Sequence, residues 1–188
     1  ELATALYFSP DLAWQEKRPL IEAELDVVFS LTADDPQAHA LRGLLLLSEE
    51  RVADGRASIQ RALSLRPNDV NFLGWLASSY EMAGFVGTAS QYTRRAYELD
   101  PMNLPARRRL IDLLLAERSP EALPLARQTV RLFPESPLAW ISLVRTNEEL
   151  DDPVASVLAA VDALDHVTDA GYFLYHIAAI FNRFGDFD

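Results

Sequence analysis

VNFLGWLASSYEMAGFVGTASQYTRRAYELDPMN, residues 70–103, contains two stretches of helical period with a short break between them. Apolar and small residues recur at helical spacing in the first stretch, residues 71–82, and again in the second, residues 88–101. The break, AGFVG, holds two glycines, which favour a turn. Pro101 closes the second stretch, because proline cannot continue a helix. The segment therefore predicts two helices joined by a tight turn.

The same pattern recurs along the chain with a period near 34 residues. One register of small or apolar residues has spacings of 34, 34, 33 and 34 and comprises Gly43, Ala77, Ile111, Val144 and Ala178. A second register comprises Gly55, Ala89, Ala122 and Ser156, and prolines close the units at Pro67, Pro101 and Pro134. Antiparallel helices pack closely only where a side chain is small, so we expect the nearest approaches at Gly43, Ala77, Ala89 and Ala96. A repeat of this length indicates an array of stacked helix pairs.

Because small and apolar residues recur at these positions, the chain resembles the tetratricopeptide repeat family. Within residues 70–103 the signature positions are occupied by Leu73, Leu76, Ala77, Tyr80, Gly84, Ala89, Ala96 and Pro101. The segment PLAWISLV, residues 137–144, adds Trp140 and Leu143. The departures are Arg42 and Arg107 at usually apolar positions, and Gly55 and Ser156 where alanine is usual. The resemblance implies an all-α fold, a right-handed α–α superhelix built of antiparallel helix pairs.

The resemblance also implies a division of the chain into repeats. The expected units are residues 36–69, 70–103, 104–136 and 137–170, with a half-repeat over residues 171–188. Residues 1–35 do not fit the repeat and are expected to form one or more capping helices. There Pro19 suits a first helical position, followed by an apolar face of Leu20, Leu25, Val28 and Phe29.

The two ends of the chain predict a piece of a longer protein. The sequence begins without methionine and stops after the first helix of the fifth unit, so we expect further sequence on either side. The last helix, without its second helix, would leave apolar surface uncovered, and self-association through it is a possible consequence.

Charge and composition exclude several classes of partner. The 188 residues carry 17 basic and 28 acidic side chains, a net charge of -11 that repels nucleic acid and anionic membrane surfaces. No apolar run reaches the length of a membrane-spanning helix, which argues against direct membrane insertion. Without cysteine, neither the cytoplasm nor the periplasm is favoured. Lys17 is the single lysine beside sixteen arginines, a composition that suggests a bacterial source.

The residue types that support catalysis or metal binding are poorly arranged for either. The three histidines fall in different parts of the chain with no ligand spacing, and they are His39, His166 and His176. Asp35 and Asp152 each follow another aspartate and precede a proline, so we expect them to cap helices. The sequence predicts no catalytic residue, no cofactor and no metal site, and therefore a protein that is not an enzyme.

Binding is the function that the resemblance implies. In this family the first helix of each unit lines a concave groove that receives a partner protein or peptide. Carrying the groove positions over to this chain gives Gln37, Asn71, Ser78, Glu81, Arg108, Arg109, Asp112, Ile141, Arg145, Glu148, Tyr172 and Tyr175. Such a mixed lining suits a peptide with an apolar anchor and a few polar contacts.

Three consecutive arginines stand out in PARRRLIDLL, residues 105–114. Successive helical residues turn by about 100°, so the three side chains cannot form one patch. Arg107 replaces the signature tryptophan and is expected to extend its head into water, while Arg108 should enter the groove and pair with Asp112. Arg109 is the only match to the carboxylate clamp of chaperone-binding relatives, whose other positions here hold Ala40, Leu44, Trp75 and Pro105. A clamp of that kind is therefore not expected.

The sequence leaves two alternatives to a simple interaction scaffold. The repeats resemble substrate-guiding regions of larger enzymes such as glycosyltransferases. They also resemble regulatory or assembly parts of bacterial transcription factors and of envelope or polysaccharide export systems. Only the flanking sequence distinguishes these classes.

Overall fold

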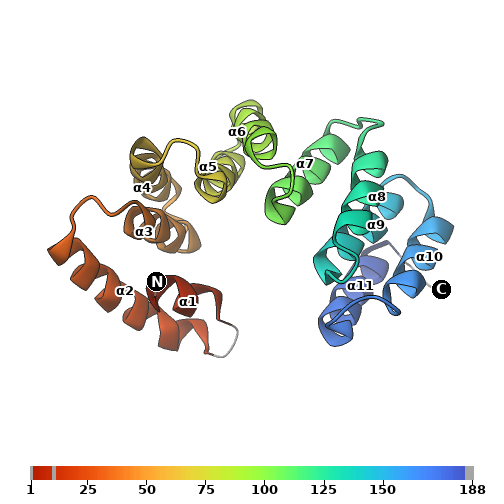
Figure 1. Cartoon of the computed structure of the whole chain (residues 1–188), viewed down its shortest axis with the longest axis horizontal. Helices are drawn as coiled ribbons and strands as arrows, with labels where there is room; N and C mark the ends of the chain where they lie inside the picture. Colours follow the sequence, from red (N-terminus) through yellow and green to blue (C-terminus); the bar gives the residue numbers. More distant parts are fainter. Residues whose placement is uncertain (1, 10–11, 185–188) are drawn as a thin grey trace. The chain divides into compact units, whose positions relative to one another are not determined.

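The computed structural model describes residues 2–9 and 12–184, and all regular structure within them is α-helical (Figure 1). The helices, in chain order, are α1 (Leu2–Phe8), α2 (Trp14–Leu31), α3 (Pro36–Ser48), α4 (Val52–Leu65), α5 (Val70–Met82), α6 (Val86–Leu99), α7 (Leu104–Ala116), α8 (Ala122–Leu132), α9 (Pro137–Glu149), α10 (Pro153–Ala163) and α11 (Ala170–Phe184). The predicted all-α fold is confirmed. The last four residues of the expected half-repeat, 185–188, lie outside the described part.

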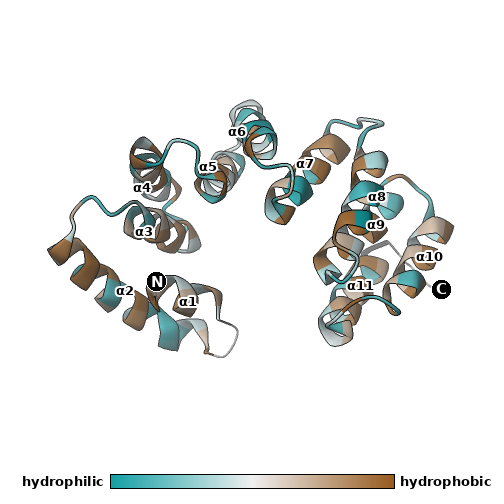
Figure 2. Cartoon of the chain, in the orientation of Figure 1, coloured by the Kyte–Doolittle hydropathy of each residue, from teal (hydrophilic) through white to brown (hydrophobic). Residues whose placement is uncertain are grey.

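The chain forms two compact units, Glu1–Leu99 and Asp100–Asp188. In the first unit, helices pack as the pairs α1–α2, α3–α4 and α5–α6, and α4 also packs on α5. In the second unit, α7 pairs with α8 and α9 with α10, while α9 also contacts α7, α8 and α11. Most helices carry both hydrophilic and hydrophobic colours in Figure 2, as expected of amphipathic helices that bury one side.

Short polar residues fix where many helices begin. Asp35 accepts a hydrogen bond from the backbone N–H of Ala38 at 2.7 Å, and Asp152 accepts one from Ala155 at 3.0 Å. These bonds satisfy backbone donors that the first helical turn leaves free. The predicted capping roles of both aspartates are confirmed. Asp69 and Asn103 cap α5 and α7 in the same way.

The turn inside each helix pair repeats one backbone conformation. The residues with positive φ are Glu50 (62°), Gly84 (79°), Arg118 (53°) and Asp151 (61°), at spacings of 34, 34 and 33 residues. Each follows the first helix of a pair and reverses the chain toward the second. Glycine adopts this left-handed conformation freely, whereas the other three side chains hold it at a cost of about 1 kcal/mol each. The sequence period is therefore visible in the backbone as well.

Helices α3 and α4 approach each other closely where Gly43 faces Gly55. A methyl group added at Gly43 would lie 2.8 Å from the Gly55 carbonyl oxygen and 2.5 Å from Cγ1 of Ile59. Only glycine fits this site on both helices. Ala77, Ala89 and Ala96 are at most 1% exposed, in agreement with the expectation that small residues mark the packed positions.

The prediction that Arg107 extends into water is wrong. The side chain is 1% exposed, and its guanidinium donates hydrogen bonds to the Thr129 hydroxyl (3.0 Å), the Pro101 carbonyl (2.7 Å) and the Gln128 side chain (2.8 Å). These neutral acceptors come from α8 and from the turn before α7, so the sequence of α7 alone gave no sign of them. Hydrogen bonds to a charged donor compensate for the loss of hydration on burial.

In two other pairs, the residue at the position of Arg107 makes the same contact with the preceding turn. The Trp140 indole donates to the carbonyl of Pro134, six residues earlier, at 2.7 Å, and Arg107 likewise reaches Pro101 six residues earlier. The Nε2 atom of His39 lies 3.1 Å from the Ala33 carbonyl, again six residues earlier. Three different side chains thus fix the turn that leads into a first helix.

Helix α2 begins earlier than the predicted start at Pro19. It starts at Trp14, so Pro19 lies inside it, and Leu20 is 51% exposed whereas Ile21 is fully buried. Tertiary contacts hold the extra turn: Lys17 donates to the carbonyls of Tyr7 and Ser9 at 3.1 and 2.9 Å. The start predicted at Pro19 was too late because the sequence of α2 does not show contacts made with α1 and the residue after it.

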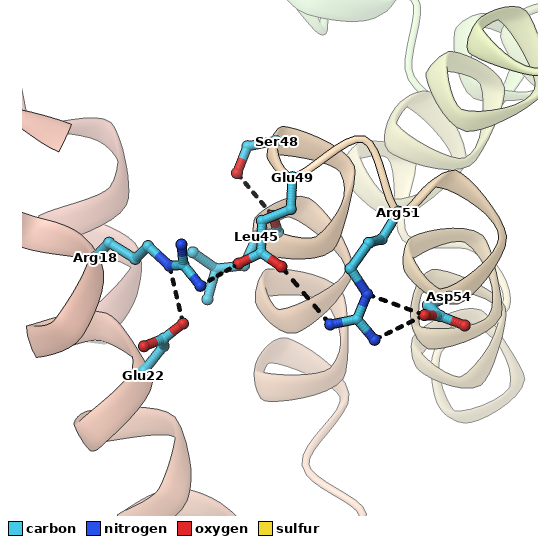
Figure 3. A network of polar contacts seen from close by, with 7 residues as sticks. All are labelled: Arg18, Glu22, Leu45, Ser48, Glu49, Arg51 and Asp54. Atoms are coloured by element: carbon cyan, nitrogen blue, oxygen red, sulfur yellow. Dashed lines mark hydrogen bonds and ion pairs between the residues drawn. The ribbon is translucent and has the colours of Figure 1, made fainter. Parts of the chain in front are cut away.

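A chain of charges connects α2 with the α3–α4 turn (Figure 3). Arg18 of α2 pairs with Glu22 at 3.0 Å and with Glu49 at 2.6 Å. Glu49 also lies 3.7 Å from Arg51, which pairs with Asp54 at 2.7 Å. The hydrogen bond that Arg51 donates to the Asp54 carboxylate raises the pKa of Arg51. Because most of these groups are exposed, the network adds little to the free energy of unfolding. Its main effect is to orient α2 relative to the α3–α4 turn.

Candidate functional site

In the first unit, the first helices of the pairs carry four of the residues predicted to bind a partner. Gln37 lies on α3, and Asn71, Ser78 and Glu81 lie on α5. Asn71 and Glu81 are exposed and Ser78 is half-buried. Gln37 differs from these three because its amide is already held, by the Thr4 hydroxyl at 3.4 Å and by Arg66 at 3.1 Å.

The hydrogen bond to Thr4 places Gln37 at a pocket that the sequence did not reveal. The pocket has a volume of about 690 Å³ and lies between α1, α2 and α3. Its lining includes apolar side chains such as Leu25, Val28 and Leu41, together with Gln37 and Arg66. The helix α1 forms one wall, and its apolar sequence LATALYF was the signal that sequence reasoning passed over.

The same helix reaches the aromatic residues of α5. Phe8 of α1 stacks on Trp75 with ring centroids 6.3 Å apart, and Trp75 lies 5.6 Å from the Phe72 ring. Trp75 is only partly buried. Trp75 therefore contacts Phe8, which also lines the pocket.

In the second unit, the first helices α7, α9 and α11 bring predicted residues together. Arg108 of α7 donates through Nε to the hydroxyl of Ser142 on α9 at 3.2 Å, and Ser142 in turn donates to the Leu138 carbonyl. Burial lowers the pKa of Arg108, and the electrostatic influence of Tyr172 on α11 partly offsets this effect. Ser142 was not among the predicted residues, although it directly follows Ile141, which was.

The ion pair on this face differs from the predicted one. Asp112 of α7 pairs with Arg145 of α9, one helix over, instead of with Arg108 on its own helix. The two side chains are 46% and 34% exposed. Arg145 reaches Asp112 because α7 and α9 pack side by side. The pair therefore connects two repeats where the sequence predicted a contact within one.

The other predicted residues of the second unit are distributed over different environments. Ile141 is 8% exposed and packs in the core cluster, so it belongs to the interior and not to the exposed face. Arg109 and Glu148 are half-buried. Tyr172 and Tyr175 are 43% and 75% exposed, and both rings contact His176.

These groups can form hydrogen bonds, pair with charges and cover apolar side chains. Within residues 2–9 and 12–184, no group of three or more histidine, aspartate or glutamate side chains could hold a metal ion. None of the helices in that part of the chain is long and apolar enough to cross a membrane.

Comparison with known proteins identifies the repeat. Residues 40–103 match the family model described as tetratricopeptide repeat. No curated protein matches the sequence. The part of the chain that matches the model contains the unit of residues 70–103 from which the resemblance was inferred.

Several solved structures share the fold. TTC0263, a thermophilic TPR protein from Thermus thermophilus, superposes with a TM-score of 0.65 at 18% identity, over 80% of this chain and 84% of that one. YrrB, described as a TPR protein with an unusual peptide-binding site, gives 0.59 at 17% identity, over 86% and 83%. MamA gives 0.59 at 16% identity, over 76% and 84%.

The family match and the shared fold agree with the repeat period, the helix pairs and the recurring turn geometry. They confirm the predicted α–α superhelical fold class, and this fold suggests a protein–protein interaction scaffold. Proteins built from such repeats are generally not catalytic. Residues 40–103 are tetratricopeptide repeats, and the fold of the chain is that of tetratricopeptide repeat proteins.

Proposed function

We propose that the second unit binds a segment of a partner protein on the face formed by α7, α9 and α11. The observation that carries the proposal is the position of Arg108. Its side chain is half-buried, yet the hydrogen bond that it forms goes to the neutral hydroxyl of Ser142. Among the described residues, Arg108 forms no ion pair.

A half-buried cation without an acidic partner favours an incoming carboxylate. Arginine presents several donors in a planar arrangement that matches carboxylate oxygens, and such bonds are strong where water is excluded. The exposed rings of Tyr172 and Tyr175 supply apolar surface on α11, the neighbouring helix. We therefore expect a partner segment with an acidic side chain next to an apolar or aromatic one.

The neighbouring Asp112–Arg145 pair limits which segments fit. Arg145 already has a carboxylate in Asp112, so it contributes less to a ligand than Arg108 does. Asp112 repels a second acidic side chain beside the first. The proposed ligand therefore has one acidic residue opposite Arg108 and no run of acidic residues.

The test uses the whole chain and a random peptide library. Peptides selected on the immobilised protein are synthesised, and their affinity is measured by fluorescence anisotropy for wild type, Arg108→Gln and the control Arg131→Gln. Arg131 is an exposed arginine on α8, so the control changes charge equally. We expect a shared acidic position among the selected peptides. Loss of a hydrogen bond to a charged group weakens binding by about 1.5–3 kcal/mol, roughly 10- to 150-fold.

Three further measurements decide the outcome. Replacing the acidic residue of the peptide by its amide should weaken binding to wild type as much as Arg108→Gln does. The two changes together should add little, because they remove the same contact. Equal affinity of Arg108→Gln and Arg131→Gln for the selected peptides would refute the proposal.

A further inference from the structure

Helix α10 exposes a stripe of large apolar side chains that no described residue covers. Val154, Val157, Leu158 and Val161 are 69%, 49%, 64% and 60% exposed. Their spacing of three, four and seven positions places them on one side of the helix. In Figure 2 most of α10 is brown, at the hydrophobic end of the scale, whereas α6 is mostly teal to white. These four residues are called the α10 stripe below.

The opposite side of α10 is buried and attaches the helix to α9. Ser156, Ala159, Ala160 and Ala163 are at most 8% exposed, and α10 packs on α9. The Ser156 hydroxyl donates to the Val144 carbonyl of α9 at 3.2 Å. The stripe is therefore not needed to attach α10 to its own unit.

The repeats show that the exposure of Val154, Leu158 and Val161, three of the four stripe residues, does not depend on where the described chain ends. The register of Gly55, Ala89, Ala122 and Ser156 assigns an equivalent in α4, α6 and the segment of α8 to each position of α10. The equivalents of Val154, Leu158 and Val161 are Ala53, Ala57 and Gln60; Gly87, Gln91 and Arg94; and Pro120, Pro124 and Arg127. All nine are exposed. These positions face solvent in every pair, and only α10 fills them with large apolar side chains.

The surroundings of the stripe are acidic. Asp151, Asp152, Asp162 and Asp165 are exposed at its ends and beside it. The sequence contains no lysine or arginine from residue 146 to residue 182. A second copy of the same surface would bring like charges together, whereas a cationic occupant would meet opposite charges.

We propose that the α10 stripe is a docking surface for an amphipathic helix of another protein, with an apolar side flanked by lysine or arginine. An apolar row at helical spacing is complementary to a matching row on a second helix. The acidic rim selects among such helices by charge. This surface lies on α10 and involves none of the residues proposed to bind a carboxylate, so the two proposals fail independently.

The probe is a synthetic amphipathic helix of leucine and lysine, labelled for fluorescence anisotropy, beside a twin with glutamate in place of lysine. The test variant is Val154→Ala, Leu158→Gln, Val161→Gln, which gives α10 residue types found at the equivalent positions of α4 and α6. The control is Met82→Gln, Val86→Gln, which removes two side chains of the first unit that are 53% and 59% exposed. Neither variant changes the net charge.

We expect the test variant to bind the lysine peptide at least about tenfold more weakly than wild type and the control to bind it as wild type does. The glutamate twin should bind wild type poorly. Leu158→Lys serves as a second variant: it changes one exposed residue, and its positive charge should repel the lysine peptide. Circular dichroism melts establish that each variant is folded.

Three results would overturn the proposal. The first is equal affinity of wild type and of both α10 variants for the lysine peptide. The second is a wild-type dimer in sedimentation that the test variant makes monomeric, because the stripe would then join two copies of this chain. The third is binding to phosphatidylcholine vesicles that the test variant loses, which would assign the stripe to a lipid surface.

Discussion

Replacing Gly43 by alanine tests the close contact between α3 and α4. The new methyl group would lie 2.5 Å from Cγ1 of Ile59 and 2.8 Å from the carbonyl oxygen of Gly55. Ile59 is fully buried and has little room to turn aside. The carbonyl belongs to the backbone of α4, so it moves only if the helices separate.

The expected magnitude follows from two opposing effects. Alanine favours a helix over glycine by about 1 kcal/mol. Extra volume in a filled core costs about 1–3 kcal/mol, and a clash with backbone belongs at the upper end of that range. We expect a net loss of about 1–2 kcal/mol from the free energy of unfolding. For a unit of this size, that lowers the melting midpoint by roughly 5–15 °C.

The matched control is Gly87→Ala on α6. A methyl group there would meet nothing within 4 Å, so only the helical preference of alanine acts, and the melting midpoint should stay or rise. Gly55→Ala should destabilise as Gly43→Ala does, because its methyl group would lie 2.8 Å from the Gly43 carbonyl. The double variant should lose less than the sum, since the helices are already separated by the first change.

Thermal and urea unfolding followed by far-ultraviolet circular dichroism provide the measurement. The result that refutes the reasoning is a Gly43→Ala protein as stable as wild type or stabilised like Gly87→Ala. Additive losses at Gly43 and Gly55 would show that the two methyl groups do not oppose the same helix contact.

Other substitutions have equally definite outcomes. Ala96→Leu should overpack a position that is 1% exposed and lower the unfolding free energy by about 1–3 kcal/mol; an unchanged melt would contradict the packing. Arg107→Ala should cost about 2–4 kcal/mol in urea unfolding, and Arg107→Trp should cost less, because the indole can donate to the preceding turn as Trp140 does. Trp140→Phe removes that bond alone and should cost about 1 kcal/mol by the same assay. Burial raises the pKa of Tyr7 above 10.0, so the stability that its neutral form contributes is present below pH 10 and lost as the pH rises further; Tyr7→Phe should weaken this dependence in melts recorded across that range.

The sequence by itself determined the features that depend on neighbours along the chain. Helical spacing, the glycines and prolines of the turns and the capping positions of Asp35 and Asp152 act within a few residues, so a linear pattern contains them. The period near 34 residues also predicted that the helix pairs stack on one another, because each pair alone leaves apolar surface exposed. The fold class and the family resemblance followed from these local signals.

Only the tertiary structure decided where side chains go when their partners are distant in sequence. Arg107 is buried because α8 and the preceding turn supply acceptors. Asp112 forms its ion pair with Arg145 because α9 lies beside α7. Ile141 packs in the core. The side of a helix that faces its neighbour depends on the packing of the whole unit. Residues at equivalent positions of different repeats therefore have different environments.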